Sequence, residues 1–177
     1  MPGILIVAET EGDAAARNEQ LVGLAQSLAK ESKQDVSIAI LGPDADRLVS
    51  LISQFDVRHV VAAALEPDKS SPSARAELLI DLIRAEEPSV VLCCDSLRVR
   101  SFVAAVASEL RLGFASGVTA AWYDDSGLVV QRGAFGDLCT LDMDFTDKGI
   151  ALVTVDPQLR TDPPRRSATA APVRTVV

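Results

Sequence analysis

The chain has 177 residues, enough for one α/β domain with its own hydrophobic core but too few for two full domains. Its formal charge is −8 at pH 7, and residues 160–177 hold four arginines against one aspartate, so the preceding part carries −11. A surface this acidic repels phosphate backbones, which argues against nucleic acid and anionic membranes as partners. A protein partner with a basic surface fits the charge better.

Three cysteines, Cys93, Cys94 and Cys139, form an odd set without the spacing of a metal site. The first two lie in an apolar run, which favours buried free thiols in a reducing compartment, with a vicinal redox pair as the alternative. The chain shows neither the basic start and apolar core of a signal peptide nor an apolar run of about 20 residues. We therefore expect a cytoplasmic protein with no membrane span.

Short apolar runs and amphipathic segments alternate through the first 110 residues. The runs predict buried strands at 4–8, 36–41, 59–63 and 90–94. The segments between and after them predict helices near 14–31, 44–55, 74–87 and 97–110, with Asp44 capping the second and Asp95 or Ser96 the fourth. This order predicts an α/β fold, an open parallel sheet with helices on both faces, of the adenine nucleotide alpha hydrolase-like or Rossmann-like kind.

The pattern changes after Leu110. Short strands are expected at 118–123, 128–131, 138–143 and 150–155, joined by turns too short for crossover helices. They should therefore be antiparallel and extend one edge of the sheet, completing a domain over 1–157. Residues 158–177 are rich in Pro, Arg, Ser and Thr and are predicted to be a polar tail or linker, although 173–177 could pair as an edge strand.

The carboxyl edge of such a sheet is where ligands bind, and it should carry the loop 9–13 and Asp95-Ser96. That loop holds Glu9, Glu11 and Asp13 with a single glycine, and the chain has no glycine-rich phosphate motif, which argues against phosphate binding there.

Ser96 at the start of a helix, followed by Arg98 and Arg100, is a better candidate for an anion site. A helix cap with two solvated arginines explains the same residues. The chain's single histidine, His59, opens a strand away from any nucleophile, so we expect no catalytic constellation and no metal site.

Several segments, taken in order, resemble the N-terminal domain of the alpha subunit of electron-transfer flavoproteins. They are 4–9, 87–92, 98–112, 116–120, 127–129, Arg132, 134–136 and 151–155, and the likeness covers about 4–157. The sequence departs from the family's pattern at Gly133, Asp137 and Asp156. The resemblance implies a further C-terminal domain that holds FAD, so no flavin contact can be carried onto these residues.

The resemblance implies a scaffold that packs beside a beta-type subunit of similar fold and, with it, cradles the flavin domain for exchange with redox partner proteins. FAD is then expected in the complex but not on this chain alone, and AMP belongs to the beta-type partner. Ser96, Arg98 and Arg132 are the only candidate cofactor contacts, and no catalytic residue is expected.

Two alternatives stay open. One is a stand-alone adenine-nucleotide-binding module of the universal-stress or nucleotide-hydrolase-like fold, with Asp95, Ser96 and the first loop around the ligand. The other is a homodimer assembled through the antiparallel edge.

Overall fold

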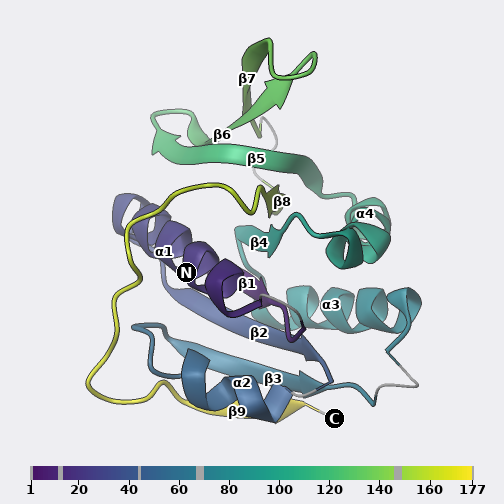
Figure 1. Ribbon diagram of the computed structural model, residues 1–177, viewed down its shortest axis with the longest axis vertical. Coiled ribbons are helices and arrows are strands. Elements are labelled where there is room, and N and C mark those ends of the chain that lie inside the picture. Colours follow the sequence, from purple (N-terminus) through teal and green to yellow (C-terminus); the bar gives the residue numbers. More distant parts are fainter. Residues whose placement is uncertain (1, 12–13, 44, 67–69, 146–148, 177) are drawn as a thin grey trace.

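A computed structural model describes residues 2–11, 14–43, 45–66, 70–145 and 149–176. Its helices are α1 (Ala14–Ser32), α2 (Ala45–Ile52), α3 (Pro72–Glu86) and α4 (Leu97–Leu110). Its strands are β1 (Ile4–Ala8), β2 (Val36–Gly42), β3 (His59–Ala64), β4 (Val90–Cys94), β5 (Gly113–Asp124), β6 (Gly127–Ala134), β7 (Cys139–Asp144), β8 (Ala151–Val155) and β9 (Val173–Val176). Across the described residues they form one nine-stranded sheet in the order β7-β6-β5-β8-β4-β1-β2-β3-β9 (Figure 1).

The centre of the sheet is parallel and covered by helices on both faces. Ile4 and Ile6 of β1 pack in one apolar cluster with residues of α1 and α2, whereas Leu5 and Val7 pack in a second cluster with residues of α3 and α4. Because both faces are covered, β1, β2, β4 and β8 are buried along their whole length. The predicted α/β class and the helices on both faces are confirmed.

Strand β1 lies between β4 and β2, and both pairings are parallel. From β1 the chain adds β2 and β3 on one side and then returns to add β4 on the other. The crevice between the carboxyl ends of β1 and β4 is therefore the point where the strand order reverses, the usual ligand position in open α/β sheets.

The antiparallel extension is shorter than predicted. Strands β5, β6 and β7 form an antiparallel meander, but β8 lies between β4 and β5 and runs parallel to both. The prediction that 150–155 is antiparallel is wrong. Its residues Ala-Leu-Val-Thr-Val have no apolar-polar alternation, the pattern of a strand buried on both faces of a parallel sheet.

Residues 158–172 run along the body before β9 pairs parallel with β3 (Figure 1). The side chain of Gln26 on α1 bonds the backbone N–H and C=O of Arg165, and the guanidinium of Arg166 lies 4.9 Å from the ring centroid of Phe55. The sequence allowed residues 173–177 to be either part of a linker or an edge strand, and the structure shows an edge strand, β9. The division into a domain at 1–157 and a tail at 158–177 stays a prediction.

Helix α2 is shorter than the apolar spacing predicts. It ends at Ile52, so Phe55 is buried beyond it, and Leu51 is 44 % exposed rather than on the inner face. The predicted cap Asp44 lies outside the described residues. Over the described ranges, no helix is long and apolar enough to cross a membrane.

Candidate functional site

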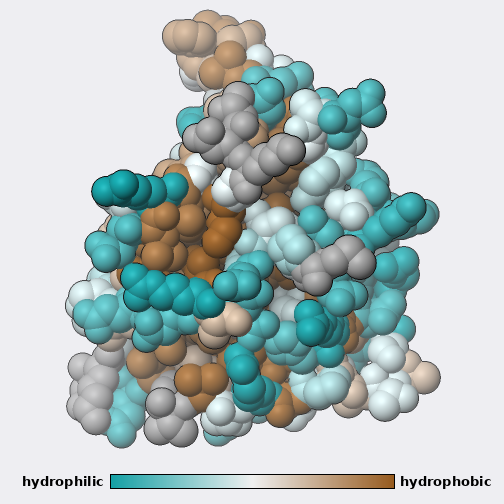
Figure 2. All heavy atoms as spheres, turned by 180° about the vertical axis from the view of Figure 1, so that it is seen from behind, coloured by the Kyte–Doolittle hydropathy of each residue, from teal (hydrophilic) through white to brown (hydrophobic). Residues whose placement is uncertain are grey.

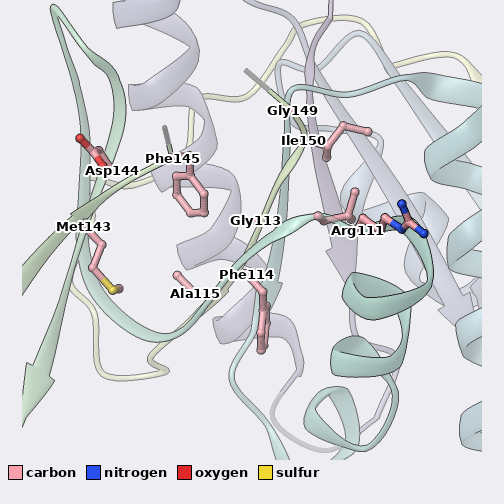
Figure 3. A pocket seen from close by; sticks show the side chains of 10 residues that line it. Arg111, Gly113, Phe114, Ala115, Met143, Asp144, Phe145, Gly149 and Ile150 are labelled. Carbon is pink, nitrogen blue, oxygen red and sulfur yellow. The ribbon is translucent and has the colours of Figure 1, made fainter. Parts of the chain in front are cut away.

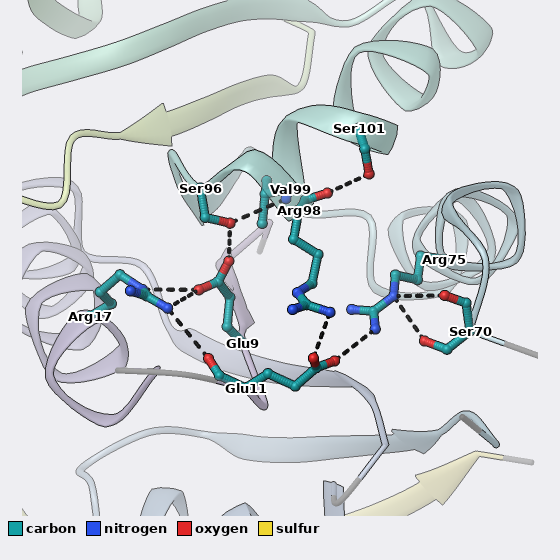
Figure 4. Close-up of polar contacts among 9 residues, drawn as sticks. All are labelled: Glu9, Glu11, Arg17, Ser70, Arg75, Ser96, Arg98, Val99 and Ser101. Atoms are coloured by element: carbon teal, nitrogen blue, oxygen red, sulfur yellow. Dashed lines mark hydrogen bonds and ion pairs between the residues drawn. The ribbon is translucent and has the colours of Figure 1, made fainter. Parts of the chain in front are cut away.

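The crevice between β1 and β4 is bridged by the chain's own side chains (Figure 4). Ser96 caps α4: its hydroxyl oxygen accepts a hydrogen bond from the backbone N–H of Val99 at 3.2 Å. The same hydroxyl donates to the carboxylate of Glu9, which directly follows β1. Of the two predicted caps, Ser96 is the one that the structure shows, and both of its hydrogen-bonding roles are filled.

Glu9 is held from several directions. Its carboxylate lies 2.9 Å from the guanidinium of Arg17 on α1, and the residue is only 6 % exposed. The amide of Asn18 bonds the backbone of Glu9 twice, accepting from its N–H at 3.0 Å and donating to its C=O at 2.9 Å. A buried carboxylate needs such partners, because burying an unpaired charge is costly.

Glu11, two residues further on, receives two arginines. Its carboxylate lies 2.6 Å from the guanidinium of Arg98 on α4 and 3.2 Å from that of Arg75 on α3 (Figure 4). Arg75 is nearly buried and is also held by Ser70, to whose hydroxyl it donates at 2.9 Å. The loop after β1 is therefore tied to three helices by charge.

These contacts limit which anions the region around Ser96 can bind. A helix N-terminus and nearby arginines would suit a phosphate. Here the Ser96 hydroxyl bonds the carboxylate of Glu9, and Arg98 forms an ion pair with Glu11. The anions bound at this edge are therefore carboxylates of the chain itself. Ser96 and Arg98 thus lie together at the start of α4, as the sequence predicted, but each already bonds a carboxylate of the loop after β1.

Arg100 turns away from Arg98 toward Asp95. It donates to the Asp95 carboxylate from Nε at 2.8 Å and from Nη2 at 2.5 Å, and the hydroxyl of Thr154 donates to the same carboxylate at 3.0 Å. The hydrogen bonds from Arg100, with a smaller one from Thr154, hold the pKa of Asp95 below its usual range.

Arg132 lies on β6 and borders a recess beside Asp95 and Arg100. Its hydrogen bonds go to Ser116 and Gly133, whereas Ser96 and Arg98 bond the carboxylates of Glu9 and Glu11. A role for Ser96, Arg98 or Arg132 in cofactor binding stays a prediction.

The remaining candidate reactive side chains are the single histidine and the three cysteines. His59 begins β3 at the amino edge and lies 2.9 Å from the carboxylate of Glu86. All three cysteines are free, with Cys139 exposed and Cys93 and Cys94 buried. Burial raises the pKa of Cys93 well above its usual range and that of Cys94 to about 11, which favours inert thiols over a redox pair. Among the described residues, no cluster of His, Cys, Asp and Glu could hold a metal ion.

A cavity of about 350 Å³ lies at the amino ends of β5 and β8 (Figure 3). Its lining includes Phe114, Met143, Phe145 and Ile150, and the ring of Phe145 packs directly against Gly113. It is on the opposite edge from the β1–β4 crevice, so the usual ligand position of this fold does not favour it.

Sequence reasoning missed the partners that neutralise the acidic loop. Arg17 and Asn18 lie in the first turns of the helix that follows it, close enough in sequence to have been considered. Arg75 is 64 residues from Glu11, and no local pattern links the two.

Together the sheet order and the crevice define a class: a Rossmann-like α/β protein whose switch point is filled by its own charged side chains. The chain belongs to the electron transfer flavoprotein domain family, whose family model matches residues 4–177. It is 29% identical over 160 residues to the electron transfer flavoprotein subunit alpha of Methylophilus methylotrophus, covering 90% of this chain and 50% of that protein. The chain thus spans about half the length of this relative, and the resemblance stated from the sequence is confirmed.

Proposed function

We propose that this chain is an alpha-type scaffold of a cytoplasmic electron-transfer flavoprotein system. It pairs with a beta-type subunit and positions a flavin carried elsewhere for exchange with redox partner proteins. The observation that carries this proposal is the family match over residues 4–177 combined with similarity to about half of an alpha subunit. FAD is expected in the assembled complex, and AMP in the beta-type partner.

The filled crevice supports a scaffold role. A nucleotide seated between β1 and β4 would have to displace Glu9 from Ser96 and Arg17, which would leave a nearly buried carboxylate without partners. Side chains that bond one another at the switch point suit a chain that contributes shape and surface to a complex better than one that holds a nucleotide there.

The hairpin formed by β6 and β7 has the exposed apolar surface expected of a site that binds a partner protein. Phe135, Leu138 and Leu141 are 80 %, 87 % and 45 % exposed, and β7 is an edge strand of the described sheet. Figure 2 shows hydrophobic residues exposed at the top of the molecule, where this hairpin projects. Exposed apolar residues beside an open strand edge are typical of a protein interface. We assign the beta-type subunit to this surface.

The first test is native mass spectrometry, with a flavin absorbance scan, on the chain isolated gently from its own source. We expect a larger complex that contains flavin and a second subunit, with no flavin on the separated chain. A lone monomer or homodimer that carries AMP or ATP would overturn the proposal in favour of an adenine-nucleotide-binding module.

A pair of leucine variants tests the hairpin. Leu138→Ser should weaken the complex about tenfold or more, the loss expected of a central apolar contact. Leu97→Ser is the matched control, because Leu97 is 86 % exposed but lies at the start of α4. Equal effects of the two substitutions would show that the hairpin is not the contact surface.

A further inference from the structure

A recess of about 370 Å³ opens at the carboxyl edge beside the filled crevice. One wall is apolar and consists of Val103 and Ala104 on α4 and Phe114 on β5. The other carries Arg100, Ser116 and Arg132. An apolar wall facing a few convergent polar groups is the usual make-up of a small-molecule site.

Arg132 is a charged group of the recess that makes only two long hydrogen bonds within the described residues. Its side chain is half-buried, and its hydrogen bonds go to two neutral oxygens, the Ser116 hydroxyl at 3.4 Å and the Gly133 carbonyl at 3.5 Å. Within the described ranges it forms no ion pair with a carboxylate. A guanidinium has five N–H donors, so most of the donors of Arg132 remain available.

Asp95, the nearest carboxylate in the recess, is already committed. It accepts both hydrogen bonds from Arg100 and one from Thr154, so Arg100 neutralises it, and Arg132, whose charge also helps to lower the pKa of Asp95, adds a second positive charge. The lining therefore has a net charge of about +1 in a chain whose formal charge is −8. A local positive charge of this kind selects an anion.

The backbone of β5 is irregular where it lines the recess. The pairing of β5 with β8 shifts register between Ala115 and Val118, and Gly117 within this irregularity has φ of +65°. A Cβ at Gly117 would lie 3.5 Å from the Asp95 carboxylate, so a larger side chain would crowd the floor of the recess. Bulges that re-aim side chains are over-represented beside functional sites.

We propose that this recess binds a small organic anion, whose carboxylate or phosphate pairs with Arg132 and whose apolar part lies against Phe114. Phe114 is 42 % exposed, so an apolar group placed there would remove aromatic surface from water. Bidentate pairing with the guanidinium supplies the charge recognition. Every group that forms the recess lies on this chain, so its binding can be measured without a partner.

The test is isothermal titration of the full chain, without a partner, with benzoate, phenyl phosphate and inorganic phosphate. We expect the two aromatic anions to bind with dissociation constants of about 1 mM or below, and inorganic phosphate to bind about tenfold more weakly. If phenyl phosphate binds and benzoate does not, the head group is phosphate, and the reverse result identifies a carboxylate. Absence of saturable binding of both aromatic anions at about 10 mM would overturn the proposal.

Variants locate the binding. Arg132→Gln should weaken binding of the aromatic anions about tenfold, and Phe114→Ala should weaken them toward the affinity of inorganic phosphate. Arg58→Gln is the matched control: it removes the same charge from an exposed arginine, 3.9 Å from Asp35, at the amino edge of the sheet. An equal loss in Arg58→Gln would show that general charge, and not this recess, attracts the anion.

Discussion

The hydroxyl of Ser96 donates to the carboxylate of Glu9, which lies 87 positions away in the sequence, while it caps α4 by accepting from the backbone N–H of Val99. It therefore joins the carboxyl end of β1 to the start of α4. This contact explains why a position suited to binding an external anion is engaged within the fold.

Substitution of Ser96 separates its two roles. Ser96→Ala should lower the free energy of unfolding by about 1–2 kcal/mol, because it removes an N-cap. Ser96→Asp keeps a good N-cap but places a second carboxylate against Glu9, so it should be at least as destabilising as Ser96→Ala. Urea unfolding measures both, and an Asp variant as stable as the parent chain would contradict the Glu9 contact.

Asp95 should make stability depend on acid pH. In the folded chain its pKa is lowered below the usual value of an aspartate carboxyl, mainly by the hydrogen bonds from Arg100. Its stabilising contribution is therefore fully present above about pH 4–5 and is lost as the pH falls through the folded pKa. Asp95→Asn should flatten the pH dependence of urea unfolding below pH about 4. A parallel curve in the variant would show that Asp95 does not carry this dependence.

Arg98 and Arg75 share Glu11 but should differ in importance. Arg98→Ala should change the free energy of unfolding by about 1 kcal/mol or less. Both side chains of its ion pair are exposed to solvent, Arg98 by 45 % and Glu11 by 34 %, and solvent weakens such a pair. Arg75→Ala should cost more, since Arg75 is 6 % exposed and also bonds Ser70. Thermal melts of the two variants side by side check this order, and a larger loss in Arg98→Ala would mean that Arg98 is structurally required.

Gly23 tests the packing of the C-terminal segment on α1. An alanine inside a helix is normally stabilising by about 1 kcal/mol relative to glycine. Here a Cβ would lie 2.4 Å from the carbonyl oxygen of Asp162, so Gly23→Ala should displace the segment and destabilise the chain. Trypsin cleavage after Arg165 or Arg166 should become faster.

Gly149→Ala is the control for this experiment, because a Cβ at Gly149 would meet no atom of the described residues within 4 Å. It should leave the tryptic pattern and the melting temperature unchanged. Unaltered cleavage in Gly23→Ala would contradict the observed contact between residues 161–162 and α1.

Val91 tests the central position of β4. It is fully buried and lies in register between Leu5 of β1 and Leu152 of β8. Val91→Asp buries a carboxylate without a partner, at a cost of several kcal/mol against a total stability of about 5–15 kcal/mol, and should unfold the chain. Leu138→Asp, at an exposed position, should change stability by about 0.5 kcal/mol or less. A soluble Val91→Asp protein with a cooperative melt would contradict the assignment of β4.

Local pattern was sufficient where one residue type dominates a short stretch. The apolar runs in β1, β2, β3 and β4 could be recognised because a strand covered on both faces consists mostly of apolar residues. The same reasoning applied to Ala151–Val155 would have placed β8 inside the sheet. The short turns before β8 led instead to the expectation of an antiparallel strand. Such turns allow either direction when the strand pairs with β4, which is far away in the sequence.

The sequence alone determined the α/β class and the resemblance to electron-transfer flavoproteins, and it narrowed the cap of α4 to Asp95 or Ser96, because each depends on the order of residues along the chain. Only the tertiary structure decided how the charges at the carboxyl edge are paired. Glu11 pairs with Arg75 and Arg98 from two helices, Asp95 pairs with Arg100, and Arg132 forms no ion pair among the described residues. Pairing of this kind depends on which strand ends adjoin and where each helix begins, and the spacing of residues along the chain carries no record of either.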